Sequence, residues 1–385
     1  MNMKSVIMKF IMLIILSYGF LMADAERIEF AVWPSADNQE NPDIYGDIVV
    51  WQQLIGDYGD YDILAADINN LSRPPFFNTN TASDQTNPAV FENYIVWQSL
   101  ISDSNTSDWD IHMADISRPN EPDVYFVTGI INNDEQKPAI HGNIVVWEDG
   151  MPEHLNIYGA DITRLSSPTE FLVTGVNSDQ NKPAIYKNIV VWQDLFAQNR
   201  DIYAADIWMR NKPAEYPVSI IKHDQESPAV SEKQIVWADN YFGNWDIYAA
   251  DISDLDNPAE TAISINSWDE TNPDIDGNII VWQARKNNNW DIFAYNITTR
   301  KTFQITNDSH DQTNPAISGK TIVWQDNRNG HNQIYGTLLS DIEAAYCTQK
   351  LAADINNDCK VDEADYIIMS NMWLDCSLYP PEACQ

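Results

Sequence analysis

Residues Pro228–Tyr248 read PAVSEKQIVWADNYFGNWDIY, and variants of this phrase recur through the chain. In each copy a proline is followed nine residues later by a tryptophan. The seven pairs are Pro42/Trp51, Pro88/Trp97, Pro138/Trp147, Pro183/Trp192, Pro228/Trp237, Pro273/Trp282 and Pro315/Trp324. Successive prolines lie 42 to 50 residues apart, and the intervals are rich in β-branched and aromatic residues. This period predicts a seven-bladed β-propeller.

Each copy divides into four short runs of strand-forming residues. In the fourth copy they are Pro183–Ile185, Asn188–Trp192, Asp201–Ile207 and Glu215–Ile220. Turn-forming residues separate them. We name these runs A to D: run A starts at the proline, run B ends at the tryptophan, and run C holds an Asp-Ile-Tyr or related triplet. No helical periodicity is sustained before residue 340. The sequence therefore predicts an all-β domain over residues 26–340.

The two ends of the array predict how the propeller closes. The last copy has runs A to C, from Pro315 to about Leu339, and no run D follows. The first copy is preceded by an extra run, Arg27–Val32. Its spacing matches the junction between run D and run A in other copies. We expect this N-terminal strand to complete the seventh blade beside three C-terminal strands, because closure removes an exposed sheet edge.

The repeat resembles TolB-type propeller repeats, on the residues around Pro228, Trp237 and Asp246-Ile247-Tyr248. It is similar to tandem repeats found in secreted and surface proteins of some bacteria and archaea. The resemblance covers roughly residues 27–340 and implies the fold. It implies no single activity, because unrelated functions share this architecture.

The N-terminus predicts export. Lys4 and Lys9 precede the apolar stretch Phe10–Met22, and Ala23-Asp24-Ala25 is a small-x-small cleavage site. We expect residues 1–25 to be a signal peptide and the mature protein to be secreted or held at the cell surface. The apolar stretch is shorter than the ~20 residues that span a bilayer. We see no other candidate, so we expect no transmembrane segment in the mature chain.

The charge excludes some partners. The 385 residues carry a formal net charge of −35, from 57 acidic and 22 basic side chains. We expect no nucleic-acid partner, because binding of phosphate depends on Lys and Arg. Anionic lipids and polyanionic glycans are disfavoured for the same reason unless metal ions bridge. The acidity favours the solubility of an exported protein, and binding of divalent cations over the surface is the alternative.

The tail, residues 341–385, contains a predicted calcium loop at residues 354–365. Oxygen-bearing residues stand at loop positions 1, 3, 5, 9 and 12, a spacing that wraps a chain around Ca²⁺. The expected ligands are the side chains of Asp354, Asn356, Asp358 and Asp365, the backbone carbonyl of Lys360, and Asp362 directly or through water. Glu363–Trp373 reads as an amphipathic helix.

This segment resembles a dockerin repeat, the module by which secreted polysaccharide-degrading enzymes dock onto cohesin domains. It departs from that family in having one loop and in having Cys359 where glycine is usual. All four cysteines, Cys347, Cys359, Cys376 and Cys384, lie in this tail. On an exported chain they predict two disulfides, and three pairings remain open. A calcium-stabilised cap or a wall-attachment tail is the alternative to docking.

A polar pair precedes run A in every copy and predicts a ring on one face. The residues are Asn38, Asp84, Asp134, Asp179, Asp224, Asp269 and Asp311, followed by Gln39, Gln85, Glu135, Gln180, Gln225, Glu270 and Gln312. The connections D-to-A and B-to-C emerge on the same face, which adds Asp149, Asp194, Asp239 and Asp326. We interpret the ring as structural, with each Asp accepting backbone N–H groups in the turn that enters run A.

The seven repeat tryptophans are expected to pack between blades. Candidate ligand-binding residues must break the repeat or stand in variable loops. On the same face they are Trp109, Trp245, Trp290, Arg285, Arg328, His154 and His331. The three tryptophans end the B-to-C loop, where exposed rings could stack on sugars, and burial between blades is the alternative.

No catalytic residue is identified. The chain has no Ser/His/Asp signature, phosphate loop or HExxH helix, and its carboxylates are too numerous to single out a glycosidase pair. The sequence favours an exported binding or scaffold propeller that recognises an extracellular protein, including a cohesin-like one, or a glycan. The alternatives are a secreted carbohydrate-active enzyme (a polysaccharide lyase or glycoside hydrolase) and a structural surface-layer protein. Ca²⁺ is the only cofactor expected.

Overall fold

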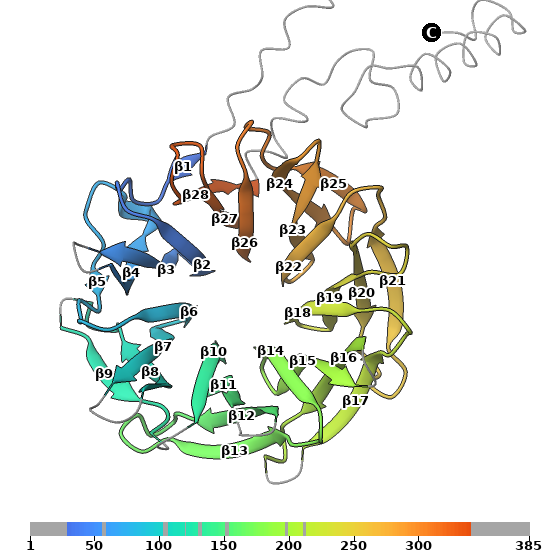
Figure 1. The fold of residues 1–385 in the computed structure, drawn as a ribbon, viewed down its shortest axis with the longest axis horizontal. Coiled ribbons are helices and arrows are strands. Elements are labelled where there is room, and N and C mark those ends of the chain that lie inside the picture. Colours follow the sequence, from blue (N-terminus) through green and yellow to red (C-terminus); the bar gives the residue numbers. More distant parts are fainter. Residues whose placement is uncertain are drawn as a thin grey trace, which may run out of the picture. The chain divides into compact units, whose positions relative to one another are not determined.

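The computed structural model describes residues 29–339, except 56–58, 103–106, 120, 130–132, 151–153, 197–198 and 211–212. These residues form seven four-stranded antiparallel sheets around a central axis (Figure 1). Blade 1 contains β2 (Gln39–Tyr45), β3 (Ile48–Ile55), β4 (Asp60–Asp67) and β5 (Phe77–Asn78). Blade 2 contains β6 (Gln85–Phe91), β7 (Tyr94–Ser102), β8 (Ser107–Asp115) and β9 (Asp123–Phe126). The seven-bladed all-β prediction is confirmed.

The remaining blades repeat this order. Blade 3 contains β10 (Asp134–His141), β11 (Ile144–Gly150), β12 (Leu155–Asp161) and β13 (Thr169–Thr174). Blade 4 contains β14 (Asp179–Tyr186), β15 (Ile189–Phe196), β16 (Asn199–Asp206) and β17 (Ala214–Ser219). Blade 5 contains β18 (Gln225–Ser231), β19 (Gln234–Asp239), β20 (Asp246–Asp251) and β21 (Ala259–Ser264). Blade 6 contains β22 (Glu270–Asp276), β23 (Ile279–Lys286), β24 (Asn289–Asn296) and β25 (Lys301–Gln304).

The seventh blade joins both ends of the array. It contains β26 (Gln312–Ser318), β27 (Thr321–Asp326) and β28 (Gln333–Leu338), and the N-terminal strand β1 (Phe30–Ala31) is its outer strand. Phe30 pairs with Gly336, and the Val32 N–H donates to the Ile334 carbonyl at 2.8 Å. A Cβ atom on Gly336 would lie 2.9 Å from the Phe30 ring, so a larger residue there would push this ring aside. The predicted closure of one strand plus three is confirmed.

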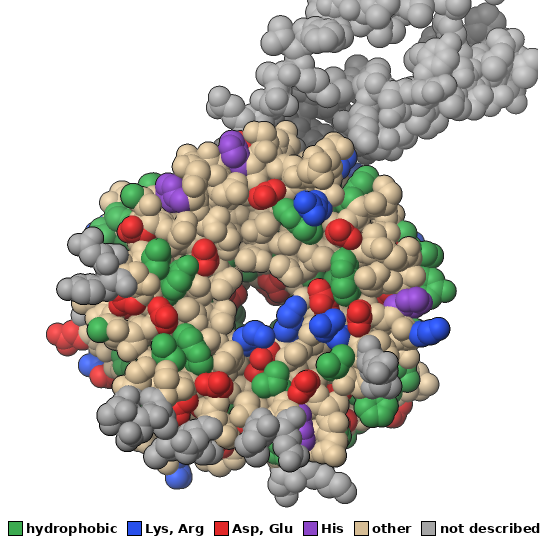
Figure 2. Space-filling view, viewed as in Figure 1, with side chains coloured by type: hydrophobic (Ala, Val, Ile, Leu, Met, Phe, Trp, Pro, Cys, Tyr) green, Lys and Arg blue, Asp and Glu red, His purple; other side chains and the backbone are tan. Residues whose placement is uncertain are grey.

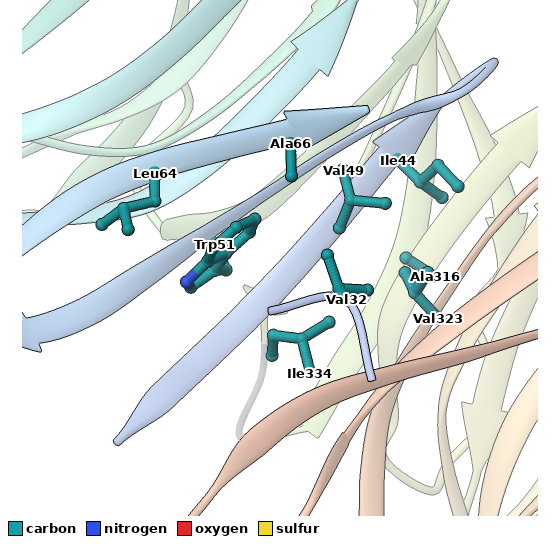
Figure 3. Close-up of a cluster of buried hydrophobic side chains, with 9 residues drawn as sticks. All are labelled: Val32, Ile44, Val49, Trp51, Leu64, Ala66, Ala316, Val323 and Ile334. Atoms are coloured by element: carbon teal, nitrogen blue, oxygen red, sulfur yellow. The ribbon is translucent and has the colours of Figure 1, made fainter. Parts of the chain in front are cut away.

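The core lies between neighbouring blades. Figure 3 shows the cluster that Val32, Ile44, Trp51, Ala316 and others form where blade 7 meets blade 1. All seven repeat tryptophans are at most 2% exposed. Six of them belong to clusters that include residues of the preceding blade; Trp237 of blade 5, for example, packs with Val191 and Ile202 of blade 4. The predicted inter-blade role of the tryptophans is confirmed.

The proline lies inside run A, which corrects the predicted start of that strand. In blade 1 the strand begins at Gln39, three residues before Pro42, and its register shifts between Glu40 and Asp43. Equivalent register shifts interrupt the first strand of every other blade. Proline has no N–H to donate and is tolerated at a bulge on an edge strand. The sequence pattern marked the bulge rather than the beginning of the strand.

The described residues contain one short helix, the 3₁₀ turn η1 (Ile68–Asn70). Within them no helix is long and apolar enough to cross a membrane. The signal peptide, the calcium loop with its six ligands, the four cysteines and the Glu363–Trp373 helix lie outside the described residues, so they stay predictions.

Candidate ligand-binding face

The predicted polar ring joins each blade to the next. The seven acceptors are Asp84, Asp134, Asp179, Asp224, Asp269, Asp311 and Asn38, and their donors are the backbone N–H groups of Tyr61, Trp109, Leu155, Arg200, Trp245, Trp290 and Asn332. These bonds measure 2.9–3.2 Å. The donors belong to run C of the preceding blade, not to the turn entering run A as expected. Seven equivalent bonds support the structural interpretation.

The second residue of the polar pair is buried. Gln39, Gln85, Glu135, Gln180, Gln225, Glu270 and Gln312 are 0–2% exposed. Several bond within the blade: Gln39 Nε2 donates to Gln53 Oε1 at 2.9 Å, and Glu270 accepts the Trp282 indole N–H at 3.2 Å. These groups are therefore part of the blade interior and are not displayed to a ligand.

The residue immediately before each repeat proline forms a second ring, which we call the channel-mouth ring. Its members are Asn41, Asn87, Lys137, Lys182, Ser227, Asn272 and Asn314, all with φ between 49° and 55°. In six blades the member's backbone N–H donates, at 2.6–3.4 Å, to the residue that follows the tryptophan in the preceding blade. Left-handed backbone is uncommon for residues other than glycine, and asparagine is enriched in it. Asn occupies four of the seven positions.

The two lysines break the symmetry of the channel-mouth ring. Each of the four asparagines donates its side-chain amide to the glutamine after the tryptophan of its own blade, as Asn41 does to Gln52 at 3.0 Å. In blade 3 the corresponding pair is charged, with Lys137 Nζ 3.0 Å from Glu148 Oε1. In blade 4 Lys182 Nζ instead reaches the next blade and donates to Ser227 Oγ at 2.8 Å.

Arg200, the second residue of β16 in blade 4, adds a third cation. Its guanidinium lies 3.8 Å from the Asp224 carboxylate, and 41% of its side chain is exposed. Burial lowers the pKa of Lys182, and the charges of Lys137 and Arg200 add to this effect, whereas the carboxylates of Glu226 and Glu148 oppose it. Figure 2 shows blue side chains gathered at one side of the central opening, where Figure 1 places β10, β14 and β18. We call Lys137, Lys182 and Arg200 the cationic cluster.

Sequence reasoning missed the two lysines. Their signal was present, because both stand directly before a repeat proline where other copies have Asn or Ser. Strained backbone at a residue poorly suited to it is a pointer to function. Asn or Ser at this position is sufficient for folding in the other blades, as at Asn87 and Ser227. The two lysines are therefore not explained by folding alone.

The three predicted tryptophans are half-buried at the same position of run C. Trp109, Trp245 and Trp290 lie in or just before β8, β20 and β24, and their backbone N–H groups take part in the inter-blade bonds. Trp245 and Trp290 belong to adjacent blades, whereas Trp109 is separated from them by blades 3 and 4. The exposed Arg285 guanidinium lies 6.0 Å from the centre of the Trp290 ring. Trp245, Trp290 and Arg285 therefore share one sector, next to that of Arg200.

Arg328 and His331 take part in closing the propeller. Arg328 pairs with Asp326 at 2.5 Å and with Glu29 of the N-terminal segment at 2.8 Å. Its side chain also lies 4.3 Å from the centre of the Tyr335 ring. The His331 imidazole is 2.8 Å from the carbonyl of Ser35. His154 is half-buried immediately before β12 in blade 3, so the fold separates it from His331 in blade 7 by two blades on one side and three on the other.

A hydrogen-bonded carboxyl pair lies between blades 2 and 3. Glu135 is 1% exposed, and burial together with the Asp110 carboxyl raises its pKa to about 9. Thr128 Oγ1 donates to Glu135 at 3.2 Å. Glycosidases hold their two carboxyls about 5 to 9 Å apart to flank a sugar bond. A directly bonded, buried pair shares a proton and does not provide that geometry.

Over the described ranges, no group of three or more His, Cys, Asp or Glu side chains is arranged to hold a metal ion. Binding of divalent cations over the acidic surface therefore has no identified site among these residues.

No protein-family model and no curated protein matches this chain. Solved structures with a similar fold include an oligogalacturonate lyase from Vibrio parahaemolyticus, 8% identical, with a TM-score of 0.61 over 83% of this chain and 95% of the lyase. They also include a prolyl endopeptidase, 10% identical, with a TM-score of 0.60 over 80% of this chain and 47% of that chain.

TolB proteins are among the structural neighbours. TolB from Acinetobacter baumannii is 14% identical, with a TM-score of 0.46 over 66% of this chain and 62% of TolB. The chain thus spans less than two thirds of this TolB and of the prolyl endopeptidase. At such identities the likeness shows a shared propeller fold and says nothing about activity.

Proposed function

We propose that this protein is an exported binding propeller that recognises a carboxylate-bearing extracellular glycan at the channel mouth, over blades 3 to 5. The observation that carries the proposal is the break in the sevenfold symmetry of the channel-mouth ring at Lys137 and Lys182, with Arg200 close enough to affect the charge of Lys182. Structural rings repeat in every blade, so a local departure on strained backbone points to a ligand rather than to folding.

The chemistry of the cationic cluster suits a carboxylate with neighbouring hydroxyls. Arg and Lys supply donors to carboxylate oxygens, and Ser227 together with Glu148 offers partners for hydroxyl groups. Trp245 and Trp290, in the adjoining sector, could stack on sugar rings along the same face. The small number of basic residues, 22 against 57 acidic ones, fits a site for one carboxylate rather than an extended groove for a polyanion.

A secreted carbohydrate-active enzyme is the second candidate function. Among such enzymes, the lowered pKa of Lys182 favours a polysaccharide lyase. A lyase needs a base beside a neutralised uronate carboxylate, and a lysine with a lowered pKa is a suitable base. One of the structural neighbours is an oligogalacturonate lyase. The carboxyl pair of blades 2 and 3 gives no support to a glycoside hydrolase.

The test combines a glycan array with a uronate-polymer assay that follows unsaturated product in the ultraviolet. We expect saturable binding to uronate-containing glycans and no product. The variant K137N/K182N places at both positions the residue found in four other blades, so it should fold normally and bind at least tenfold more weakly. K233N/K301N, which removes two exposed lysines outside the cationic cluster, is the matched control.

Three outcomes would replace the proposal. Unsaturated product that disappears in K182N would assign the lyase. Binding to a protein partner that survives in K137N/K182N would move the site to another surface. Calcium-dependent self-assembly of the full chain, without glycan binding, would assign a surface-layer protein. Attachment through the dockerin-like tail, to a cohesin or otherwise, is a separate part of the proposal and is tested by calcium uptake.

A further inference from the structure

The loop between β19 and β20 in blade 5 displays two aromatic rings to solvent. Tyr241 is 51% exposed and Phe242 is 58% exposed. Their rings meet edge to face, with centroids 4.9 Å apart, and the Tyr241 ring makes a second edge-to-face contact with the His223 imidazole at 5.3 Å. Single apolar residues on a surface need no explanation, but rings that gather at one place point to a binding site.

The backbone of this loop forms a tight turn. The Asn240 N–H donates to the Asp224 carbonyl at 3.0 Å, and the Gly243 N–H donates to the Asn240 carbonyl at 3.3 Å. The Tyr241 N–H donates to Asp239 Oδ1 at 2.8 Å, and Gly243 has a φ of 89°. The turn therefore depends on the asparagine, the glycine and the backbone, and none of these bonds involves an aromatic ring.

Blade 7 shows that the same turn folds without aromatic residues. The Asn327 N–H donates to the Asp311 carbonyl at 3.2 Å, and the Gly330 N–H donates to the Asn327 carbonyl at 2.9 Å. The two positions between them hold Arg328 and Asn329, whose side chains bond to other parts of the propeller. The aromatic pair of blade 5 is therefore not explained by the fold of the loop.

A cleft of about 510 Å³ opens beside the two rings. The residues that line it come from the start of β16, from the connection between β17 and β18, and from this loop, so the cleft lies on the candidate ligand-binding face. They include Asn199, Lys222, Asp224, Asn240, Tyr241 and Phe242. Pockets for small molecules measure about 300–1,000 Å³, so this cleft has room for a single sugar unit.

The cleft adjoins the cationic cluster through Asp224. Asp224 Oδ1 accepts the backbone N–H of Arg200 at 2.9 Å, and the Arg200 guanidinium lies 3.8 Å from the same carboxylate. A glycan that places a carboxylate at the cationic cluster can therefore extend into the cleft.

The polar groups of the cleft favour an uncharged ligand. Lys222 is exposed and forms no ion pair among the described residues, and Asp224 supplies a charge of the opposite sign. The Asn240 side chain makes no hydrogen bond within the same part of the chain, and its amide can both donate and accept. A pyranose has C–H groups on its faces and hydroxyls at its rim, which suit aromatic rings and an amide respectively.

We propose that this cleft binds a neutral pyranose unit, packed against Tyr241 and Phe242 with its hydroxyls toward Asn240 and Lys222. The inference rests on the proposed function, because it assigns the sugar next to the one whose carboxylate the cationic cluster holds. It extends the recognised glycan from one charged unit to a charged unit joined to a neutral one.

The test measures binding of methyl glucoside, methyl galactoside and methyl mannoside to the full chain by saturation-transfer NMR. We expect saturable transfer to the C–H protons of at least one of them. Binding should be at least tenfold weaker in Y241S/F242N, which removes both rings and places at the second position the residue found in blade 7. K137N/K182N should bind the methyl glycoside like the wild type, because the lysines lie outside the cleft.

Two further variants make the result decisive. F242N alone should also weaken binding, and it is the test if the double variant fails to fold. W208S removes a ring that is 80% exposed outside the cleft and places there the serine found at Ser117 and Ser253. This control should bind like the wild type.

Several outcomes would overturn the proposal. They are no saturable transfer to any of the three glycosides, unchanged binding in the variant that folds, loss of binding in W208S, and tighter binding of phenol, which would indicate an aromatic side chain of a protein partner. Trigalacturonate serves as the charged probe. Trigalacturonate binding that K137N/K182N leaves unchanged would overturn the function proposed for the channel mouth and its link to this cleft, while the methyl glycosides still decide the cleft itself.

Discussion

The backbone N–H of Tyr61 donates to the carboxylate of Asp84 in the next blade at 2.9 Å. The same bond recurs between all seven pairs of adjacent blades, and Asn38 provides it for Asn332 where blade 7 meets blade 1. Each acceptor stands in the segment that enters the first strand of one blade, and each donor stands at the start of the third strand of the preceding blade. The bonds therefore help to set the spacing of neighbouring sheets.

Removing one such acceptor should destabilise the propeller without changing its architecture. We expect D84A to lower the free energy of unfolding by about 1–3 kcal/mol, because the Tyr61 N–H loses its partner inside the protein. D84N should cost much less, since Asn38 fills the same role in blade 1. Urea denaturation of the two variants checks this; equal losses for Ala and Asn would contradict the hydrogen-bond explanation.

Closure of the ring can be tested at Val32. This side chain is 1% exposed and packs with Trp51 and Ile334 between blades 7 and 1. V32D should destabilise the protein by about 3 kcal/mol or more, because a carboxylate would be buried without a partner. I220D, at a position 59% exposed, is the control and should stay within about 0.5 kcal/mol of the wild type. Thermal unfolding measures both.

Asp43 should make stability depend on pH. Burial raises the pKa of its carboxyl to about 7, with a smaller contribution from the charge of Asp274, whose own pKa is raised to about 6. The folded state therefore holds more protons than the unfolded state between about pH 4 and 7, and the free energy of unfolding should fall as pH rises through this interval.

The variant D43N isolates that effect. Asn stays neutral and can still accept the Val90 N–H, which Asp43 accepts at 2.7 Å. Its stability relative to the wild type should therefore increase from pH 5 to pH 8 in urea denaturation series. E121Q removes one exposed charge and controls for net charge. A constant difference between D43N and wild type across this range would contradict the assignment.

The calcium loop of the tail can be tested in the full chain. Isothermal titration should detect Ca²⁺ uptake that D354A/D358A removes, because two of the predicted carboxylate ligands are lost. D123A/D254A, which removes two exposed carboxylates of the propeller, should retain the uptake. Uptake that is equal in both variants would show that the ion binds elsewhere, and no uptake in the wild type would exclude the loop.

Much of the fold could be predicted because strand registration is strict. A one-residue slip turns every side chain of a strand to the other face, so Trp97 and Trp147 keep a fixed distance from their prolines while loops vary. The start of run A could not be predicted, because the pattern around Pro42 records a bulge, and a bulge is a feature of pairing between strands.

The face that carries the candidate site could also be predicted from the sequence, but only some of the residues of that site were identified. Trp290 and Arg285 were identified as departures from the repeat, whereas Lys137 and Lys182 were not. Arg328 and His331 looked like free polar groups in the sequence. In the folded ring they contact Glu29 and Ser35, almost three hundred residues away in the chain.

The sequence alone determined the number of blades, the position of each tryptophan and the strand that closes the ring, because these follow from local strand patterns repeated at a fixed period. Only the tertiary structure decided that Lys137 and Arg200 lie near enough to Lys182 to affect its charge, and that Tyr241 and Asn199 line one cleft. Local positive charge and cavities depend on residues that are distant in the sequence and become neighbours only in the folded ring. The net charge of −35 gives no sign of a local cluster of basic residues.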